Sequence, residues 1–271
     1  MQRKDILNIL ISCKQAINNS IAYLRECNKT INEPFLVGYK SQDNIITTFD
    51  TTAQNIILDT FVKKCDTGFI FYSEEFNGTK TYGNPEIKII TDPLDQTSSF
   101  MYGNLEFASS SIIVLDLENN PLCAVVGDVS NNRLYYADKN NAKYGDKNLR
   151  PSTKVDLLEA RIAVYAEKNS RKHLYDKTIF PLMECGARVV NNGGSLFACR
   201  VADRRFHAAL EPKPVGLYEF AGAYIAEMAG CVVTDIEGNK IDYNPERKNT
   251  YIVASNLRIL EEILKTIGIR K

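Results

Sequence analysis

The pattern of apolar residues changes near residue 150, and this change limits the folds open to the chain. Two amphipathic helix patterns, at 5–28 and 50–64, come first. Short β-rich segments follow at 68–72, 87–91, 108–117, 122–128 and 133–137. Asn-rich turns join several of them, which predicts antiparallel hairpins. After residue 151, strands alternate with helices near 171–185, from 195, 219–229 and 257–267. We therefore predict a layered α/β (α+β) fold with an N-terminal antiparallel-sheet half and a C-terminal mixed α/β half.

The 271 residues are enough for one large α/β unit or for two joined halves. No internal repeat or Pro/Gly-rich linker separates the halves. We expect a single domain over 1–271, with parts at about 1–150 and 151–271. The polar, Gly-containing stretch 38–44 is predicted to be an exposed loop.

The composition argues against several classes of partner. Lys plus Arg equal Asp plus Glu at 33 each, so no net field steers the chain toward nucleic acid or a membrane. The seven cysteines are dispersed and include no C-x-x-C pair, which indicates reduced thiols. We expect neither a signal peptide nor an apolar run of membrane-spanning length, and therefore a cytoplasmic protein.

Two acidic residues follow a buried strand pattern in the segment Ile87–Phe100. The apolar run ends at Asp92, Pro93 is predicted to stop the strand, and Asp95 precedes a Thr/Ser series suited to starting a helix. Carboxylates at such a turn suit a hard cation such as Mg²⁺, and amides beyond them suit a phosphate oxygen. For this segment alone, the alternative is a turn in which the two acids merely cap the backbone.

The apolar strand predicted over 68–72 is also followed by acids, at Glu74 and Glu75. Both strands are thus expected to deliver carboxylates to one rim. Three motifs, in this order along the chain, resemble those of the inositol monophosphatase and fructose-1,6-bisphosphatase superfamily. They are Ser73-Glu74-Glu75, Asp92-Pro93-Leu94-Asp95-Gln96-Thr97 and Leu217-Tyr218-Glu219. The resemblance implies a layered αβαβα sugar-phosphatase fold and commonly a homodimer or homotetramer. The length and the turn 235–239 look most like the short archaeal-type enzymes with both activities.

The resemblance also implies roles for individual residues. Two Mg²⁺ ions would be held by the side chains or carbonyl of Glu74, Asp92, Leu94, Asp95 and Glu219. Asp50 and Glu75 would place a third ion or the attacking water, which Thr97 would orient. The amides of Gln96 and Thr97 would hold the phosphate. Substrate contacts are implied for Gly194, Ser195, Glu211 and Lys213, and a mobile loop for the segment around Lys40. Glu211 and Lys213 are equally consistent with an ordinary exposed surface.

The function implied is Mg²⁺-dependent hydrolysis of a small sugar or polyol phosphate, fructose 1,6-bisphosphate or inositol monophosphate, by metal-activated water. Two alternatives stay open. One is a 3′-phosphonucleotide phosphatase. The other is a non-catalytic metal-binding descendant, because Gln96 stands where the superfamily usually has glycine, a residue suited to unusual backbone angles or close phosphate approach.

Overall fold

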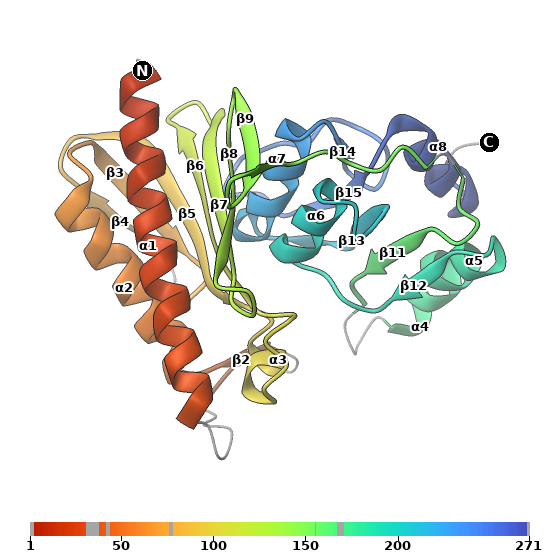
Figure 1. Ribbon diagram of the computed structural model, residues 1–271, viewed down its shortest axis with the longest axis horizontal. Helices are drawn as coiled ribbons and strands as arrows, with labels where there is room; N and C mark the ends of the chain where they lie inside the picture. The colour runs from red at the N-terminus through yellow and green to blue at the C-terminus, as the bar shows by residue number, and fades with distance from the viewer. Residues whose placement is uncertain are drawn as a thin grey trace.

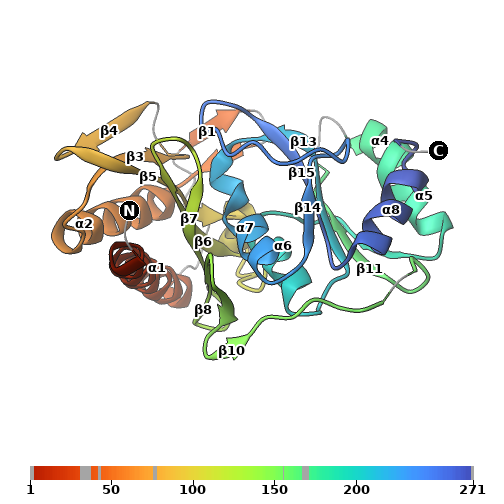
Figure 2. The same ribbon diagram turned by 90° about the horizontal axis from the view of Figure 1, so that it is seen from above.

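The computed structural model describes residues 3–30, 38–41, 44–75, 78–154, 156–166 and 171–269. Its elements form the five layers expected from the sequence (Figures 1 and 2). Helices α1 (Arg3–Thr30) and α2 (Thr48–Lys64) cover the outer face of the first sheet. Helices α6 (Ser195–Ala202) and α7 (Ala221–Met228) lie between the two sheets. The outermost layer contains α4 (Arg171–Leu174), α5 (Phe180–Glu184) and α8 (Leu257–Thr266).

The first sheet has eight strands in the order β10-β9-β8-β7-β6-β5-β3-β4. Their bounds are β3 Gly68–Ser73, β4 Thr79–Tyr82, β5 Pro85–Asp95, β6 Ser109–Asp116, β7 Pro121–Asp128, β8 Arg133–Asp138, β9 Asn141–Tyr144 and β10 Lys147–Asn148. The predicted antiparallel arrangement holds for every pair of this sheet except one, because β3 and β5 run parallel. Strand β4 follows β3 in the chain and pairs with one edge of it. The chain then crosses to the opposite edge of β3, where β5 runs in the same direction as β3.

Strand β5 continues through Pro93 to Asp95, so the prediction that this proline ends the strand is wrong. Against β6, Asp92 pairs with Ser111 and Asp95 pairs with Ser109. Two residues of β5 therefore stand opposite one residue of β6, which is a β-bulge. A bulge accommodates a proline because its residues need not donate to the ladder.

The second sheet has the order β12-β11-β13-β15-β14. Its bounds are β11 Arg161–Val164, β12 Arg188–Val190, β13 Ala208–Val215, β14 Val232–Thr234 and β15 Asn249–Ala254. Parallel pairs of β11 with β12 and β13 combine with antiparallel pairs of β15 with β13 and β14, which confirms the mixed C-terminal half. The chain passes from the first sheet to the second between Asn148 and Arg161. The single-domain organisation itself stays a prediction.

Three local predictions need correction. The stretch 38–44 contains a short antiparallel hairpin of β1 (Gly38–Ser41) and β2 (Asn44–Ile46) rather than a loop alone, and residues 42–43 lie outside the described residues. The helix expected over 171–185 is interrupted by a π-helical turn at Tyr175–Ile179. The helix expected from Glu219 begins as a 3₁₀ turn, Leu217–Phe220, before α7.

Three apolar clusters hold the layers together. One fills the space between the two sheets around α6 and α7, one lies between the first sheet and α1 and α2, and one lies between the second sheet and the outer helices. Burial of this apolar surface is the main favourable term for such a layered arrangement. Within the described residues, no helix combines the length and apolarity needed to cross a membrane.

Candidate functional site

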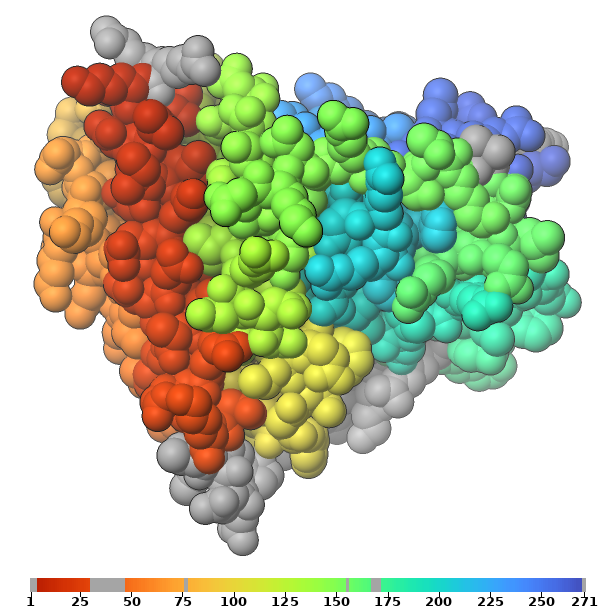
Figure 3. All heavy atoms as spheres, in the orientation of Figure 1, coloured from red at the N-terminus to blue at the C-terminus, as the bar shows by residue number. Residues whose placement is uncertain are grey.

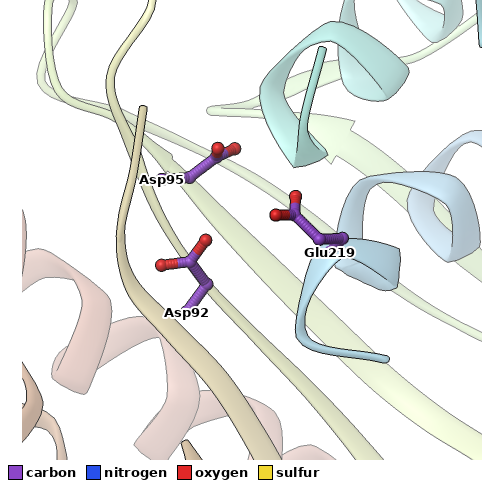
Figure 4. A group of neighbouring side chains, drawn as sticks. All are labelled: Asp92, Asp95 and Glu219. Carbon is purple, nitrogen blue, oxygen red and sulfur yellow. The ribbon is translucent and has the colours of Figure 1, made fainter. Parts of the chain in front are cut away.

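Three carboxylates from distant parts of the chain converge between the sheets (Figure 4). Asp92 and Asp95 come from the bulged end of β5, and Glu219 comes from the 3₁₀ turn before α7. One oxygen of each lies within 4.8 Å of the others. The two aspartates are almost fully buried, at 2% and 5% exposure.

This arrangement is electrostatically unfavourable unless a cation is bound. Burial, with an added contribution from the charge of Glu74, raises the pKa of Asp95 to about 7, although hydrogen bonds from Ser109, Ser195 and Gln96 act to lower that pKa. Oxygen donors without imidazole or thiolate are what Mg²⁺ prefers. The residues present therefore fit a hard divalent cation.

The orientation of the two aspartates is fixed by hydrogen bonds. Ser109 Oγ and the N–H of Ser195 both donate to Asp95 Oδ2 at 3.1 Å. The Leu94 N–H donates to Asp92 Oδ1 at 3.1 Å. Ser109 was not anticipated from the sequence. Its role becomes apparent only once β5 is aligned with β6, because Ser109 is the β6 residue that pairs with Asp95.

Glu74 and Glu75 follow β3 directly, and the parallel pairing of β3 with β5 places both strand ends at one edge of the sheet. The Glu74 N–H donates to Thr91 O at 3.2 Å, one residue before Asp92. The Tyr218 pKa is raised by burial and then by the charges of Glu74, Glu219, Asp92 and Glu75. The charges of both glutamates thus act on Tyr218 together with those of Asp92 and Glu219, whereas the group within 4.8 Å contains only Asp92, Asp95 and Glu219. Tyr218 was predicted only as part of a motif, and its half-buried ring lies among these charges.

Asp50 and Thr97 form a second polar group beside the cluster. Asp50 lies in the first turn of α2 and accepts hydrogen bonds from the N–H and hydroxyl of Thr47. Thr97 Oγ1 lies 2.8 Å from Asp50 Oδ1 and 3.0 Å from the Leu94 carbonyl oxygen. Both of these neighbours are acceptors, so the Thr97 proton is directed toward them and its lone pairs remain available.

Gln96 adopts a left-handed backbone conformation, with φ 63° and ψ 47°, of the kind that glycine adopts most easily. For a residue with a Cβ this conformation costs about 1–2 kcal/mol. It precedes the short helix α3 (Thr97–Met101). The backbone at this position therefore has the glycine-like conformation despite the substitution.

Gly193 and Gly194 permit a close approach of the backbone to two acids. A Cβ on Gly194, where φ is +83°, would lie 2.2 Å from Asp95 Oδ2, and one on Gly193 would lie 2.0 Å from Glu211 Oε1. The Gly194 N–H donates to Glu211 Oε1 at 2.9 Å. Ser195 Oγ donates to the Glu219 carbonyl oxygen at 3.0 Å, which connects α6 to the backbone of the residue that carries the third carboxylate. Glu211 is buried and is therefore not the surface residue considered as an alternative.

Two lysines were predicted to contact the substrate or to lie on a mobile loop. Lys213 is half-buried in the irregular part of β13, where the pairing with β15 shifts between Glu211 and Val215. Lys40 lies in β1, and its side chain is outside the described residues. The proposed roles of both in substrate binding stay predictions.

The layered fold and the acidic cluster define a metal-dependent phosphatase class, and comparison with known proteins agrees. The inositol monophosphatase family model matches residues 7–270. The chain therefore belongs to this family of Mg²⁺-dependent phosphatases. The archaeal-type subtype stays a prediction.

Among curated relatives, the chain is 28% identical to Nus factor SuhB of Vibrio cholerae, with 97% of this chain and 95% of that protein covered. It is 25% identical to inositol monophosphatase 3 of Solanum lycopersicum, with coverages of 95% and 98%. Among solved structures, the extragenic suppressor protein SuhB of Bartonella henselae superposes with a TM-score of 0.85 at 21% identity, covering 96% of this chain and 98% of that one. That structural likeness supports the fold alone.

Proposed function

We propose that this chain hydrolyses a small sugar or polyol phosphate, with fructose 1,6-bisphosphate and inositol monophosphate as the candidate substrates. The observation that carries the proposal is the convergence of Asp92, Asp95 and Glu219 within 4.8 Å, with both aspartates buried and Glu219 half-buried. Membership of the inositol monophosphatase family supports the same chemistry. Glu74 and the Leu94 carbonyl complete the proposed ligand set for two Mg²⁺ ions, and Asp50 and Glu75 would serve a third.

Bound Mg²⁺ would neutralise these carboxylates, activate a water molecule and stabilise the charge of the leaving oxygen. The chain itself positions that water. Thr97 Oγ1, with its proton directed to Asp50 or Leu94, accepts a hydrogen bond from the water and so orients its lone pair toward phosphorus. Asp50 is held for this role by two hydrogen bonds from Thr47. This orientation supplies the positioning part of the catalysis.

For the phosphate group, we propose contacts from the N–H groups of Gln96 and Thr97. The left-handed conformation of Gln96 supports this proposal, because it is a conformation that a glycine at this position would adopt readily. It also weighs against the alternative of a non-catalytic descendant. Gly194, Ser195 and Glu211 would then face the alcohol portion of the substrate.

A sugar bisphosphate is favoured over other substrates by two features. The pair Tyr218-Glu219 has the form of fructose bisphosphatases in the superfamily, and the half-buried Lys213 supplies a cation for a second phosphate. The competing substrate class is a 3′-phosphonucleotide, because a relative from Salmonella typhimurium, 26% identical over 79% of this chain, is named 3′(2′),5′-bisphosphate nucleotidase CysQ. The Lys213→Gln variant should raise the KM for the bisphosphate more than that for inositol monophosphate.

The test is phosphate release by the full chain from sugar, inositol and nucleotide phosphates, with Mg²⁺ or with EDTA. We expect Mg²⁺-dependent release that Li⁺ inhibits and that Asp92→Asn abolishes. Asp59→Asn is the matched control, since Asp59 is exposed on α2 and should leave the rate unchanged. Absence of release from every substrate would support the non-catalytic alternative, whereas preference for the nucleotide would reject the sugar or polyol assignment.

The predicted partners are a small phosphate ester and further copies of this chain, as a homodimer or homotetramer. Light scattering of the purified chain tests the assembly. The absence of a nucleic-acid partner stays a prediction as well, because the Vibrio relative is named as a Nus factor rather than as a phosphatase. A gel-shift assay with RNA and DNA tests it.

A further inference from the structure

A second charged region lies at the end of α6 remote from the acidic site. α6 begins at Ser195, whose N–H donates to Asp95, and ends at Ala202, its eighth residue. At about 1.5 Å of rise per residue, the helix separates its two ends by about 12 Å. At this far end is a surface pocket of about 720 Å³. Figure 3 shows the end of α6, in cyan, between two green stretches of the chain.

The pocket is strongly cationic although the chain as a whole has no net charge. Five of its lining residues are basic: Arg133, Lys147, Arg150, Arg204 and Arg205. They come from β8, the β9–β10 region and the segment after α6, and all five are exposed. The chain therefore gathers like charges from three separate segments around one hollow, at a cost in mutual repulsion.

The one acidic residue of the lining, Asp203, offsets only one of these five charges. Its side chain is 11% exposed, accepts a hydrogen bond from Tyr135 Oη at 2.5 Å and pairs with Arg205 Nε at 3.0 Å. Across the described part of the chain, no ion pair includes the other four basic residues. The pocket therefore keeps a large positive excess.

The floor of the pocket is ordered by packing and hydrogen bonds. The ring of Tyr144 stacks on Tyr135 at 4.1 Å between centroids, and its hydroxyl donates to Asp128 Oδ2 at 3.1 Å. The guanidinium groups of Arg133 and Arg205 lie 5.6 and 5.5 Å from the centre of the Tyr144 ring. Two of the cations are thereby positioned on a rigid aromatic surface.

Arg204 is fixed from the other side. Its backbone has a φ of 71°, which is uncommon for a residue with a side chain, and its Nε donates to the Arg150 carbonyl oxygen at 3.0 Å. This bond joins the segment after α6 to the segment after β10, so the two halves of the basic rim are held together.

We infer that this pocket binds a small polyanion with at least two phosphate groups, at a site separate from the acidic centre. Guanidinium groups recognise phosphate oxygens through paired hydrogen bonds, and several in one hollow match several phosphates. The volume lies within the range of about 300–1,000 Å³ that is usual for small-molecule sites. A concave hollow on a chain with no net charge favours a compact ligand over a long nucleic acid, which needs an extended basic surface.

The test is calorimetric titration of the full chain with tripolyphosphate in EDTA, so that no metal bridges the anion to the acidic site. We expect one equivalent to bind, and binding to weaken as salt rises. The triple variant R133Q/K147Q/R150Q should bind at least about tenfold more weakly, which equals about 1.4 kcal/mol. None of these three side chains touches the acidic centre, so the triple variant should release phosphate at the wild-type rate.

The matched control is K4Q/K63Q/K177Q, which removes the same charge from exposed positions outside the pocket. It should bind tripolyphosphate as the wild type does. The inference is overturned if the wild type binds no tripolyphosphate, or if both triple variants lose affinity equally. Tight binding of single-stranded RNA without any binding of tripolyphosphate would also reject it, in favour of a nucleic-acid surface.

Discussion

Replacing Asp95 by asparagine should stabilise the metal-free protein at pH 8 while it removes phosphatase activity. Burial, with a contribution from the charge of Glu74, raises the pKa of Asp95 in the folded chain to about 7 from an ordinary value of 3.8. The folded state therefore favours the protonated carboxyl. The resulting penalty is absent below about pH 4, grows as the pH rises toward 7, and is complete above it.

The size of the penalty follows from the two pKa values. The difference between about 7 and 3.8, at about 1.36 kcal/mol for each pKa unit, corresponds to about 4 kcal/mol as an upper bound. Asparagine keeps one acceptor oxygen for the hydrogen bonds from Ser109 and Ser195 but accepts them more weakly than a carboxylate. We therefore expect a gain of about 1–3 kcal/mol at pH 8 and almost none at pH 4.

The assay is urea unfolding followed by circular dichroism, in EDTA, at pH 4, 6 and 8. Asp59→Asn on the exposed face of α2 is the control and should be neutral at each pH. Adding Mg²⁺ should reverse the order, because an ion that binds only the folded wild type stabilises it and not the variant. An Asp95→Asn protein less stable than the wild type at pH 8 in EDTA, or a difference that is the same at pH 4, would refute the reasoning.

Three further substitutions test the geometry of the site. Gly194→Ala should lose activity and about 3 kcal/mol of unfolding free energy in urea, because its Cβ would lie 2.2 Å from Asp95 Oδ2. Gly103→Ala, with φ +77° but no atom within 4 Å, should cost only about 1–2 kcal/mol, and equal losses in both would contradict the clash. Gln96→Gly should keep activity and change the free energy of unfolding by less than about 1 kcal/mol. Glycine relieves the strain of the left-handed conformation, but it also loses more conformational entropy on folding. An inactive variant would show that the glutamine side chain is required. Thr97→Val should lower kcat by at least about 100-fold in the phosphate assay, and a loss below tenfold would remove Thr97 from the positioning of water.

Most of the fold was predictable from the sequence because its signals are local. The periodicity of α1, the alternation of elements after residue 151 and the Asn-rich turns each depend on neighbouring residues. The parallel pairing of β3 and β5 depends instead on where β4 attaches, which is a long-range choice. The bulge at Pro93 likewise appears only when β5 is aligned with β6, so the proline was misinterpreted as the end of the strand.

The residues of the site likewise include some that a local sequence motif predicts and others that only the folded chain reveals. The acids stand in recognisable motifs, and the structure brings Asp92, Asp95 and Glu219 together. The residues that orient them carry no local signal. Ser109 acts through its register opposite Asp95, and Gly193 through the space it leaves for Glu211, so both become visible only in three dimensions.

The central claim is that the carboxylates of Asp92, Asp95 and Glu219 jointly bind a divalent cation. The most direct measurement is anomalous diffraction from crystals of the full chain soaked in Mn²⁺, used as a substitute for Mg²⁺. We predict an anomalous peak between the three side chains, within about 2.5 Å of a carboxylate oxygen of each. A map from well-soaked crystals with no peak at this position, or with Mn²⁺ only elsewhere on the protein, would contradict the account.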